Sequence, residues 1–224
     1  MPEKIAFNMD QLPGSGSVGG YIYLQPYSSN RFRLTVEVDT PDGLKSGSSV
    51  IETASWESGG LPDARGVRST VKGEAIFVDL GHGKNLIAIL GWGKLGEDES
   101  KIFYLTRAAL APNRKVEWKD EHKLKGRGDL PSSFFPTLIT FSDLGDPATA
   151  KVVSPAELAA TFGPGYSLRR MTLETTSTPV TRGIEKKLLW WSLPGRPASI
   201  AKRAWREGVR TGVSQVPEDL FQKG

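Results

Sequence analysis

Residues 31–39 read Arg-Phe-Arg-Leu-Thr-Val-Glu-Val-Asp, with polar and apolar side chains in strict alternation. Because successive side chains of a strand point to opposite faces, Phe32, Leu34, Val36 and Val38 share one face and the polar residues share the other. One apolar and one polar face are typical of an antiparallel sheet that covers a core on one side only. This stretch therefore decides the fold class.

The sequence on either side continues as short strands separated by turns. Pro41-Asp42-Gly43 predicts a turn, since Pro presets φ and Gly tolerates positive φ. Residues 48–56 predict the returning strand of a hairpin with a longer loop. Further strands are expected at residues 21–27, 71–80, 85–90, 134–141 and 167–175, with a tight turn at 81–84.

Helices are expected to be few and short. Ser154, Pro155 and Glu157 form a capping-box pattern that predicts a helix running to about Phe162 and ended by the glycines at 163–165. A second helix is expected at 198–209. Residues 101–111 fit a strand or a helical turn, and residues 113–129 predict a solvated loop.

These elements predict an α+β fold that is predominantly antiparallel β, sandwich or barrel-like, with one or two short helices and a C-terminal helix. Three parts are expected along the chain. They are a flexible N-terminal segment at 1–20, a β-rich globular domain at 21–191, and a basic C-terminal arm with a helix at 192–224, called the basic arm below.

Composition excludes several classes of protein. The 224 residues include no Cys, so disulfide frameworks and thiolate metal sites are excluded. No run of about 18 apolar residues predicts a membrane-spanning helix, and the first residues lack the apolar core of a signal peptide. We therefore expect a cytoplasmic protein as the sequence is written, or a periplasmic or membrane-anchored one if an N-terminal export segment was removed.

The net charge of +4 is unevenly distributed. Residues 180–224 carry nine Lys or Arg and four Asp or Glu, whereas the preceding residues are close to neutral. The basic character of the protein therefore belongs to the C-terminal part of the chain.

Glycines at positions 91, 93 and 96 match the G-x-G-x-x-G pattern of dinucleotide-binding loops. A phosphate site of this type needs an apolar helix next, to present its N-terminus. The chain continues instead with Glu97, Asp98 and Glu99, whose charges repel phosphate. We therefore interpret the motif as a glycine-rich hairpin loop and expect no cofactor.

Candidate catalytic residues are sparse. The two histidines, His82 and His122, have no spacing typical of a zinc site. A hydrolase acting through carboxylates or a lone His in a loop-lined cleft is kept as an alternative function. Glu37 and Asp39 lie on the polar face of the first strand, where solvation is expected.

The basic arm is the most unusual feature of the sequence. We take its candidate partner-binding residues to be Lys202, Arg203, Trp205, Arg206 and Arg210. Trp and Arg are favoured where proteins bind proteins, which predicts a protein partner. Binding of nucleic acid or of a membrane surface through the same residues is the alternative. Just before the arm, residues 188–191 are apolar enough to pack on the body.

Several stretches resemble a group of uncharacterised proteins of unknown function, mainly from alphaproteobacteria. The matching stretches are residues 34–50, 71–80, 135–141, 159–165 and 179–186. The resemblance spans roughly residues 30–190 and implies a single domain there. It implies no activity and no site residues.

The sequence thus favours a non-enzymatic, β-rich binding protein that acts through protein–protein contacts. The hydrolase and the nucleic-acid or membrane-surface binder remain alternatives.

Overall fold

The computed structural model describes residues 27–58, 66–93, 98–188, 190 and 222–223. The flexible segment expected at 1–20, most of the strand expected at 21–27 and the helix expected at 198–209 lie outside these residues.

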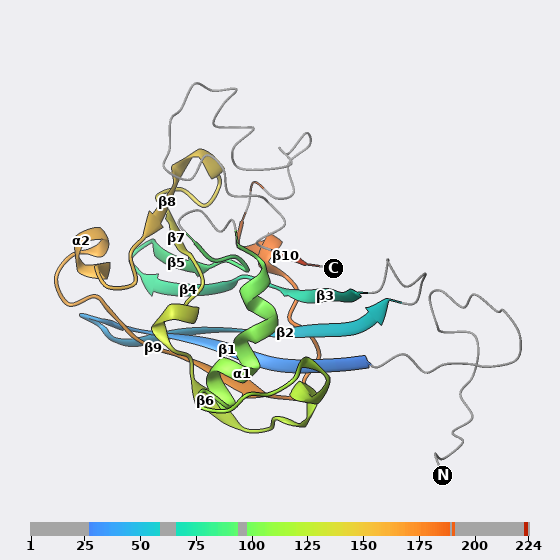
Figure 1. Cartoon of the computed structure of the whole chain (residues 1–224). Helices are drawn as coiled ribbons and strands as arrows, with labels where there is room; N and C mark the ends of the chain where they lie inside the picture. Colours follow the sequence, from blue (N-terminus) through green and yellow to red (C-terminus); the bar gives the residue numbers. More distant parts are fainter. Residues whose placement is uncertain (1–26, 59–65, 94–97, 189, 191–221, 224) are drawn as a thin grey trace, which may run out of the picture.

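The described strands form two antiparallel sheets that enclose a common core (Figure 1). The first has the order β10-β3-β2-β1-β9-β6 and the second β4-β5-β7-β8. The first sheet comprises β1 (Tyr27–Thr40), β2 (Gly43–Ser58), β3 (Gly66–Glu74), β6 (Arg127–Asp129), β9 (Ser167–Thr175) and β10 (Gln222–Lys223). The second comprises β4 (Ile76–Gly81), β5 (Lys84–Ala88), β7 (Leu138–Phe141) and β8 (Ala150–Val153). The predicted antiparallel, β-rich class is confirmed, as a sandwich of two sheets.

The alternating stretch lies in β1, at the centre of the first sheet, and pairs with β2 along its whole length. The connection is shorter than predicted: only Pro41 and Asp42 separate Thr40 from its strand partner Gly43. Gly43 has a φ of +100°, and the Thr40 hydroxyl donates to its carbonyl oxygen at 2.7 Å. The prediction of a longer loop was wrong. The hydrogen bonds of the ladder join backbone groups, so they extend the pairing of the two strands through polar residues as well as apolar ones.

The strand predicted at residues 71–80 is two strands in two different sheets. β3 ends at Glu74 and β4 begins at Ile76, so the chain changes sheets at Ala75. Gly73 has a φ of +148°, a backbone conformation that favours glycine. Val71 before this point and Ile76, Val78 and Leu80 after it all contact the main core, so apolar residues continue along the sequence and their presence conceals the break.

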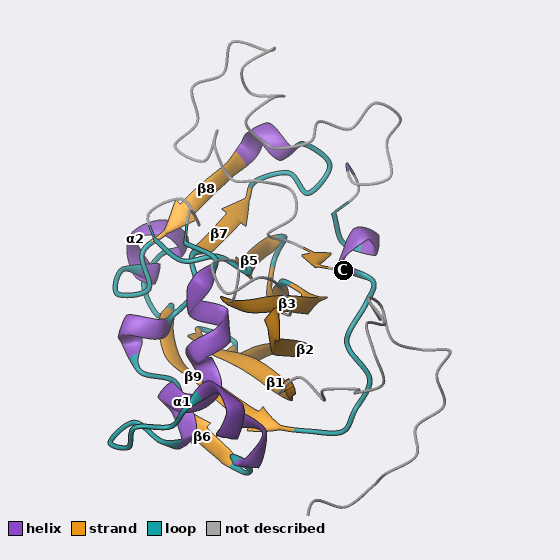
Figure 2. Ribbon diagram, turned by 45° about the vertical axis from the view of Figure 1, so that its right-hand side comes forward, coloured by secondary structure: helices purple, strands orange, loops and turns teal. Residues whose placement is uncertain are grey.

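Short helices connect the strands. The α-helices are α1 (Leu105–Leu110) and α2 (Leu158–Phe162); the 3-10 helices are η3 (Ser100–Tyr104), η4 (Trp118–Lys123), η5 (Ser132–Phe134), η6 (Pro147–Thr149) and η7 (Ile184–Lys186). Residues 101–110 are therefore helical, which decides the ambiguity left for 101–111, and α1 lies beside β6 and β9 (Figure 2). The loop predicted at 113–129 contains η4 and β6, and the strand predicted at 134–141 begins only at Leu138.

The capping box predicted for α2 is wrong, although the end of the helix is confirmed. Ser154 accepts a backbone hydrogen bond from Glu157 in a turn, and the helix begins only at Leu158, with no side-chain cap. Gly163, with a φ of +103°, ends the helix as expected.

A β-bulge explains the irregular pattern of β9. Its pairing with β1 shifts register between Glu37 and Val38, so that Val38 faces Leu168 while Glu37 faces Arg170. The extra residue is Arg169. Leu168 therefore packs against the same core as Met171, although the two are three residues apart.

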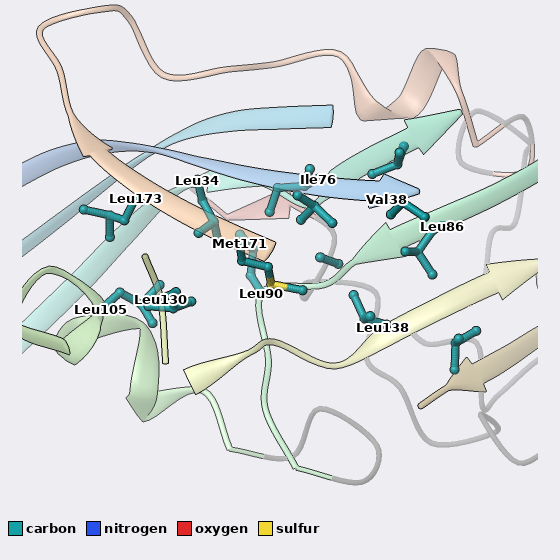
Figure 3. Packing of buried hydrophobic residues seen from close by; sticks show 14 of the residues in the cluster. Leu34, Val38, Ile76, Leu86, Leu90, Leu105, Leu130, Leu138, Met171 and Leu173 are labelled. Atoms are coloured by element: carbon teal, nitrogen blue, oxygen red, sulfur yellow. The ribbon is translucent and has the colours of Figure 1, made fainter. Parts of the chain in front are cut away.

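The main core lies between the sheets (Figure 3). Phe32, Leu34, Val36 and Val38 are at most 1% exposed, so the apolar face predicted for β1 is confirmed. α1 closes one end of this core through Leu105 and its neighbouring alanines.

We predict that Gly47→Ala destabilises the protein. A Cβ at this position would lie 2.1 Å from the carbonyl oxygen of Phe77, where β4 crosses β2. Overpacking of this kind costs about 1–3 kcal/mol, which urea unfolding measures. Gly66→Ala is the control, because nothing lies within 4 Å of its added Cβ. Equal unfolding free energies for the two variants would contradict the close crossing.

Candidate functional site

The five candidate residues of the basic arm, Lys202, Arg203, Trp205, Arg206 and Arg210, lie outside the described residues. The structure does describe the chain on both sides of them. Trp190 precedes these residues, and Gln222 and Lys223 follow them. The geometry of these two flanks shows how the body holds the arm.

The flank before the arm is an apolar cover, which we define as Ile184, Leu188 and Trp190. All three are at most 2% exposed and pack with the second sheet. Their partners in this second core include Ile87, Ile89, Ile139 and Phe141. The expected packing of residues 188–191 on the body is thus confirmed for Leu188 and Trp190, while Leu189 and Trp191 lie outside the described residues.

Glu74 anchors both flanks of the arm. Its carboxylate accepts a hydrogen bond from the backbone N–H of Ile184 at 2.8 Å, and its backbone pairs with Gln222 of β10. Glu74 is 6% exposed. Burial raises its pKa, against the opposing effect of the backbone hydrogen bond from Ile184.

The basic arm is therefore held at two points rather than one. The described residues on its two sides, the cover before it and β10 near its end, both pack on the body. Fixing both ends of a chain segment restricts the conformations that it can adopt.

A second unusual cluster lies where η4 meets the start of β1. We call Asn30, Arg107 and Glu121 the Glu121 cluster. Glu121 forms an ion pair with Arg107 of α1 and accepts a hydrogen bond from Asn30 Nδ2 at 3.4 Å. Arg107 also donates to the carbonyl oxygen of Val116 at 3.1 Å.

Burial strongly perturbs the pKa of the Glu121 carboxylate. Glu121 is 6% exposed, and burial raises its pKa to about 7, although the Arg107 charge acts to lower it. Asn30 Oδ1 and Ser28 Oγ are buried nearby with no hydrogen-bond partner among the described residues. The first sheet thus presents a polar inner face at the end of the sandwich where η4 meets the start of β1.

The Glu121 cluster can take up or release one proton near neutral pH. A perturbed carboxylate of this kind is typical of active sites, but also of structural ion pairs. Glycoside hydrolysis and related chemistry need two carboxylates, and the contacts of Glu121 are an amide and a guanidinium. In the described part of the chain, no group of three or more His, Asp or Glu could hold a metal ion.

Neither histidine lies in a buried site. His82 is in the β4–β5 turn with a φ of 53°, and its exposed ring contacts Asp42 at 2.9 Å. His122 lies exposed in η4, one residue from Glu121. The structure therefore gives the lone-His hydrolase no support.

The glycine motif at 91–96 surrounds a buried tryptophan. Trp92 is 1% exposed, and its indole N–H donates to the carbonyl oxygen of Phe134 at 2.7 Å. Its backbone pairs with Asp98 through two hydrogen bonds. This bridge closes the loop, as the hairpin interpretation expects, and residues 94–97 of the loop lie outside the described residues.

The polar face of β1 is ion-paired rather than simply solvated. Glu37 is 7% exposed and accepts two hydrogen bonds from Arg170, at 2.9 and 3.2 Å. Asp39 accepts from Arg169 Nε at 3.0 Å. The solvation predicted for Glu37 was wrong, because the bulge in β9 places two consecutive arginines on this face.

Sequence reasoning did not identify the buried carboxylates Glu74 and Glu121. Glu121 lies in a charged stretch that looks uniformly solvated. One signal was available for Asn30: the alternation of β1, continued backward from Phe32, places it on the core face. Contacts between distant segments bury all three residues.

Comparisons with models of known protein families, with curated proteins and with solved structures find no match for this chain. The resemblance to alphaproteobacterial proteins therefore stays a prediction. None of the helices described here has the length and apolar character needed to cross a membrane.

We predict that Trp190→Ala costs about 3–5 kcal/mol of unfolding free energy, because it removes a buried aromatic side chain from the second core. Trp118→Ala is the matched control, since this side chain is only half-buried. Chemical denaturation measures both variants. Losses of equal size would show that the cover does not stabilise the fold.

We predict that the protein loses stability as pH rises from about 5 to about 8. The folded state holds a proton on Glu121 up to a pKa of about 7, whereas the unfolded chain releases it near the ordinary value. The loss should be about 1–3 kcal/mol. Glu121→Gln should remove most of this slope in unfolding experiments, and Glu74→Gln a further part.

Glu117→Gln is the control for this experiment, because it alters an exposed carboxylate at the start of η4. It should leave the pH dependence unchanged. An unaltered slope in Glu121→Gln would contradict the assignment of the raised pKa.

Proposed function

We propose that this protein is a non-enzymatic binding protein that contacts a protein partner through its basic arm. One observation carries the proposal: a well-packed sandwich holds the arm at both ends, at the cover and at β10. Between these points the sequence places Lys202, Arg203, Trp205, Arg206 and Arg210.

Charge and residue type support a protein partner. From 196 to 210 the sequence holds five basic residues and one acid, Glu207. Such a segment is complementary to an acidic surface, and Trp and Arg are enriched among the few residues that dominate binding energy where proteins meet. The body adds little positive charge of its own, whereas proteins that bind nucleic acid usually present a larger basic surface.

The decisive experiment compares two triple variants of the full chain. In R203A/W205A/R206A the arm loses its candidate contacts. In R114A/K115A/W118A the body loses the same kinds of residue from the loop before η4 and from the first position of η4. Affinity purification from the native host, with nuclease present, should recover a specific partner with the wild type and the control. The arm variant should lose at least about tenfold in affinity for that partner in a purified system.

Three results would contradict the proposal. The partner could bind the arm variant as tightly as the wild type. The purified protein could bind an oligonucleotide with an affinity that falls steeply between about 50 and 200 mM salt, as nucleic-acid binding does. It could also bind anionic lipid vesicles through Trp205 in the absence of any protein.

A further inference from the structure

One edge of the first sheet has no strand partner over most of its length in the part of the chain that the structure describes. β3 pairs with β2 on one side, and on the other side β10 covers only Gly73 and Glu74. No strand that the structure describes pairs with residues 67–72 on this outer side. Residues 67–70 and 72 are exposed, and Val67 alone is 53% exposed.

The alternation of hydrogen bonds shows which backbone groups point outward. In β2 the N–H and C=O of Val50 bond Thr181 and so face away from β1. The direction of the backbone N–H and C=O groups alternates along a strand. The backbone groups of Glu52, Ala54 and Trp56 therefore also point away from β1, toward β3. Their partners Lys72, Thr70 and Arg68 use their backbone groups on β2. Val67, Ser69 and Val71 therefore present N–H and C=O groups to the open edge.

The side chains along this edge carry positive charge. Arg68 and Lys72 lie on the same face of β3, four residues apart. Among the described residues, neither forms an ion pair: Glu52, which lies opposite Lys72, is bound by Arg31 at 2.9 Å. The edge thus combines backbone groups that no described strand pairs with two cations at a fixed spacing.

We propose that the outer edge of β3, Val67 to Lys72, binds an extended acidic segment of a partner protein as an added strand. Strand addition uses backbone hydrogen bonds for affinity and alternate side chains for selectivity. Carboxylates four residues apart on the added strand would face Arg68 and Lys72 across the ladder, where opposite charges stabilise pairing. β10 already adds to this edge at Gly73 and Glu74, which shows that the edge accepts a strand.

The same charges disfavour a second copy of this chain as the occupant. Pairing β3 with another β3 would place four cations on one face of the ladder, and lysines or arginines at an edge normally prevent such self-association. This surface goes beyond the proposed function, because none of its residues belongs to the basic arm.

The test uses the full chain, labelled with ¹⁵N, and two blocked peptides. The acidic peptide reads Glu-Val-Thr-Thr-Glu-Val, and the basic control has Lys in place of both Glu. We expect the acidic peptide to shift the amide signals of Val67, Ser69 and Val71 and the basic peptide to have little effect.

Variants of one residue separate backbone pairing from other effects. Ser69→Pro removes an outward N–H and should weaken binding roughly tenfold or more, which corresponds to one lost hydrogen-bonding position. Ser69→Ala removes the same hydroxyl, which contacts Ser55 at 2.9 Å, but keeps the N–H and should bind normally. If Ser69→Pro does not fold, R68E/K72E carries the test, because it should reverse the preference to the basic peptide.

Four results would overturn the proposal. The first two are equal binding of both peptides and an unchanged peptide preference in R68E/K72E. The third is a concentration-dependent dimer of the wild type that Ser69→Pro abolishes. The fourth is slow hydrogen exchange of the amides of Val67, Ser69 and Val71 in the free chain, which would show that the chain covers its own edge. The arm variant R203A/W205A/R206A should bind the acidic peptide normally, so that failure of this proposal and failure of the proposed function are distinguishable.

Discussion

The side chains of β1 alternate between two environments, and the rest of the structure is arranged around this one strand. Its apolar residues fill the core against the second sheet, while Glu37 and Asp39 bind arginines of β9 on the opposite face. Near its start the inner face becomes polar, and Asn30 meets Glu121 of η4. The alternation of this one strand, continued back to Asn30, thus connects both sheets, the charged outer face and the buried carboxylate.

The second sheet depends on a different constraint, because each of its two faces packs against an apolar cluster. The main core covers one face and the cover before the basic arm covers the other. The same residues that complete the fold also fix the point at which the arm begins. Glu74 connects this point to β10, because its carboxylate binds the backbone of Ile184 and its own backbone pairs with Gln222. The cover before the arm therefore lies next to the end of β3.

Sequence reasoning succeeded where local patterns determine structure. The alternation at 31–39, the turn at Pro41 and the glycine at 163 all identified real features, because each depends on a few adjacent residues. It failed where distant segments meet. The change of sheet at Ala75, the bulge at Arg169 and the burial of Glu121 all depend on contacts that no local pattern encodes. For the candidate site, the sequence identified the composition of the arm and the packing of Leu188 and Trp190 just before it, but not the pairing of β10 with β3.

The central claim is that a partner protein touches the basic arm while the body serves as its support. The most direct measurement incorporates a photo-crosslinking amino acid at position 205 and, separately, at position 118 of the full chain in its native host. The account predicts crosslinks to one protein partner from position 205 and none from position 118. Crosslinks from position 118 alone, or from position 205 to nucleic acid or lipid alone, would contradict it.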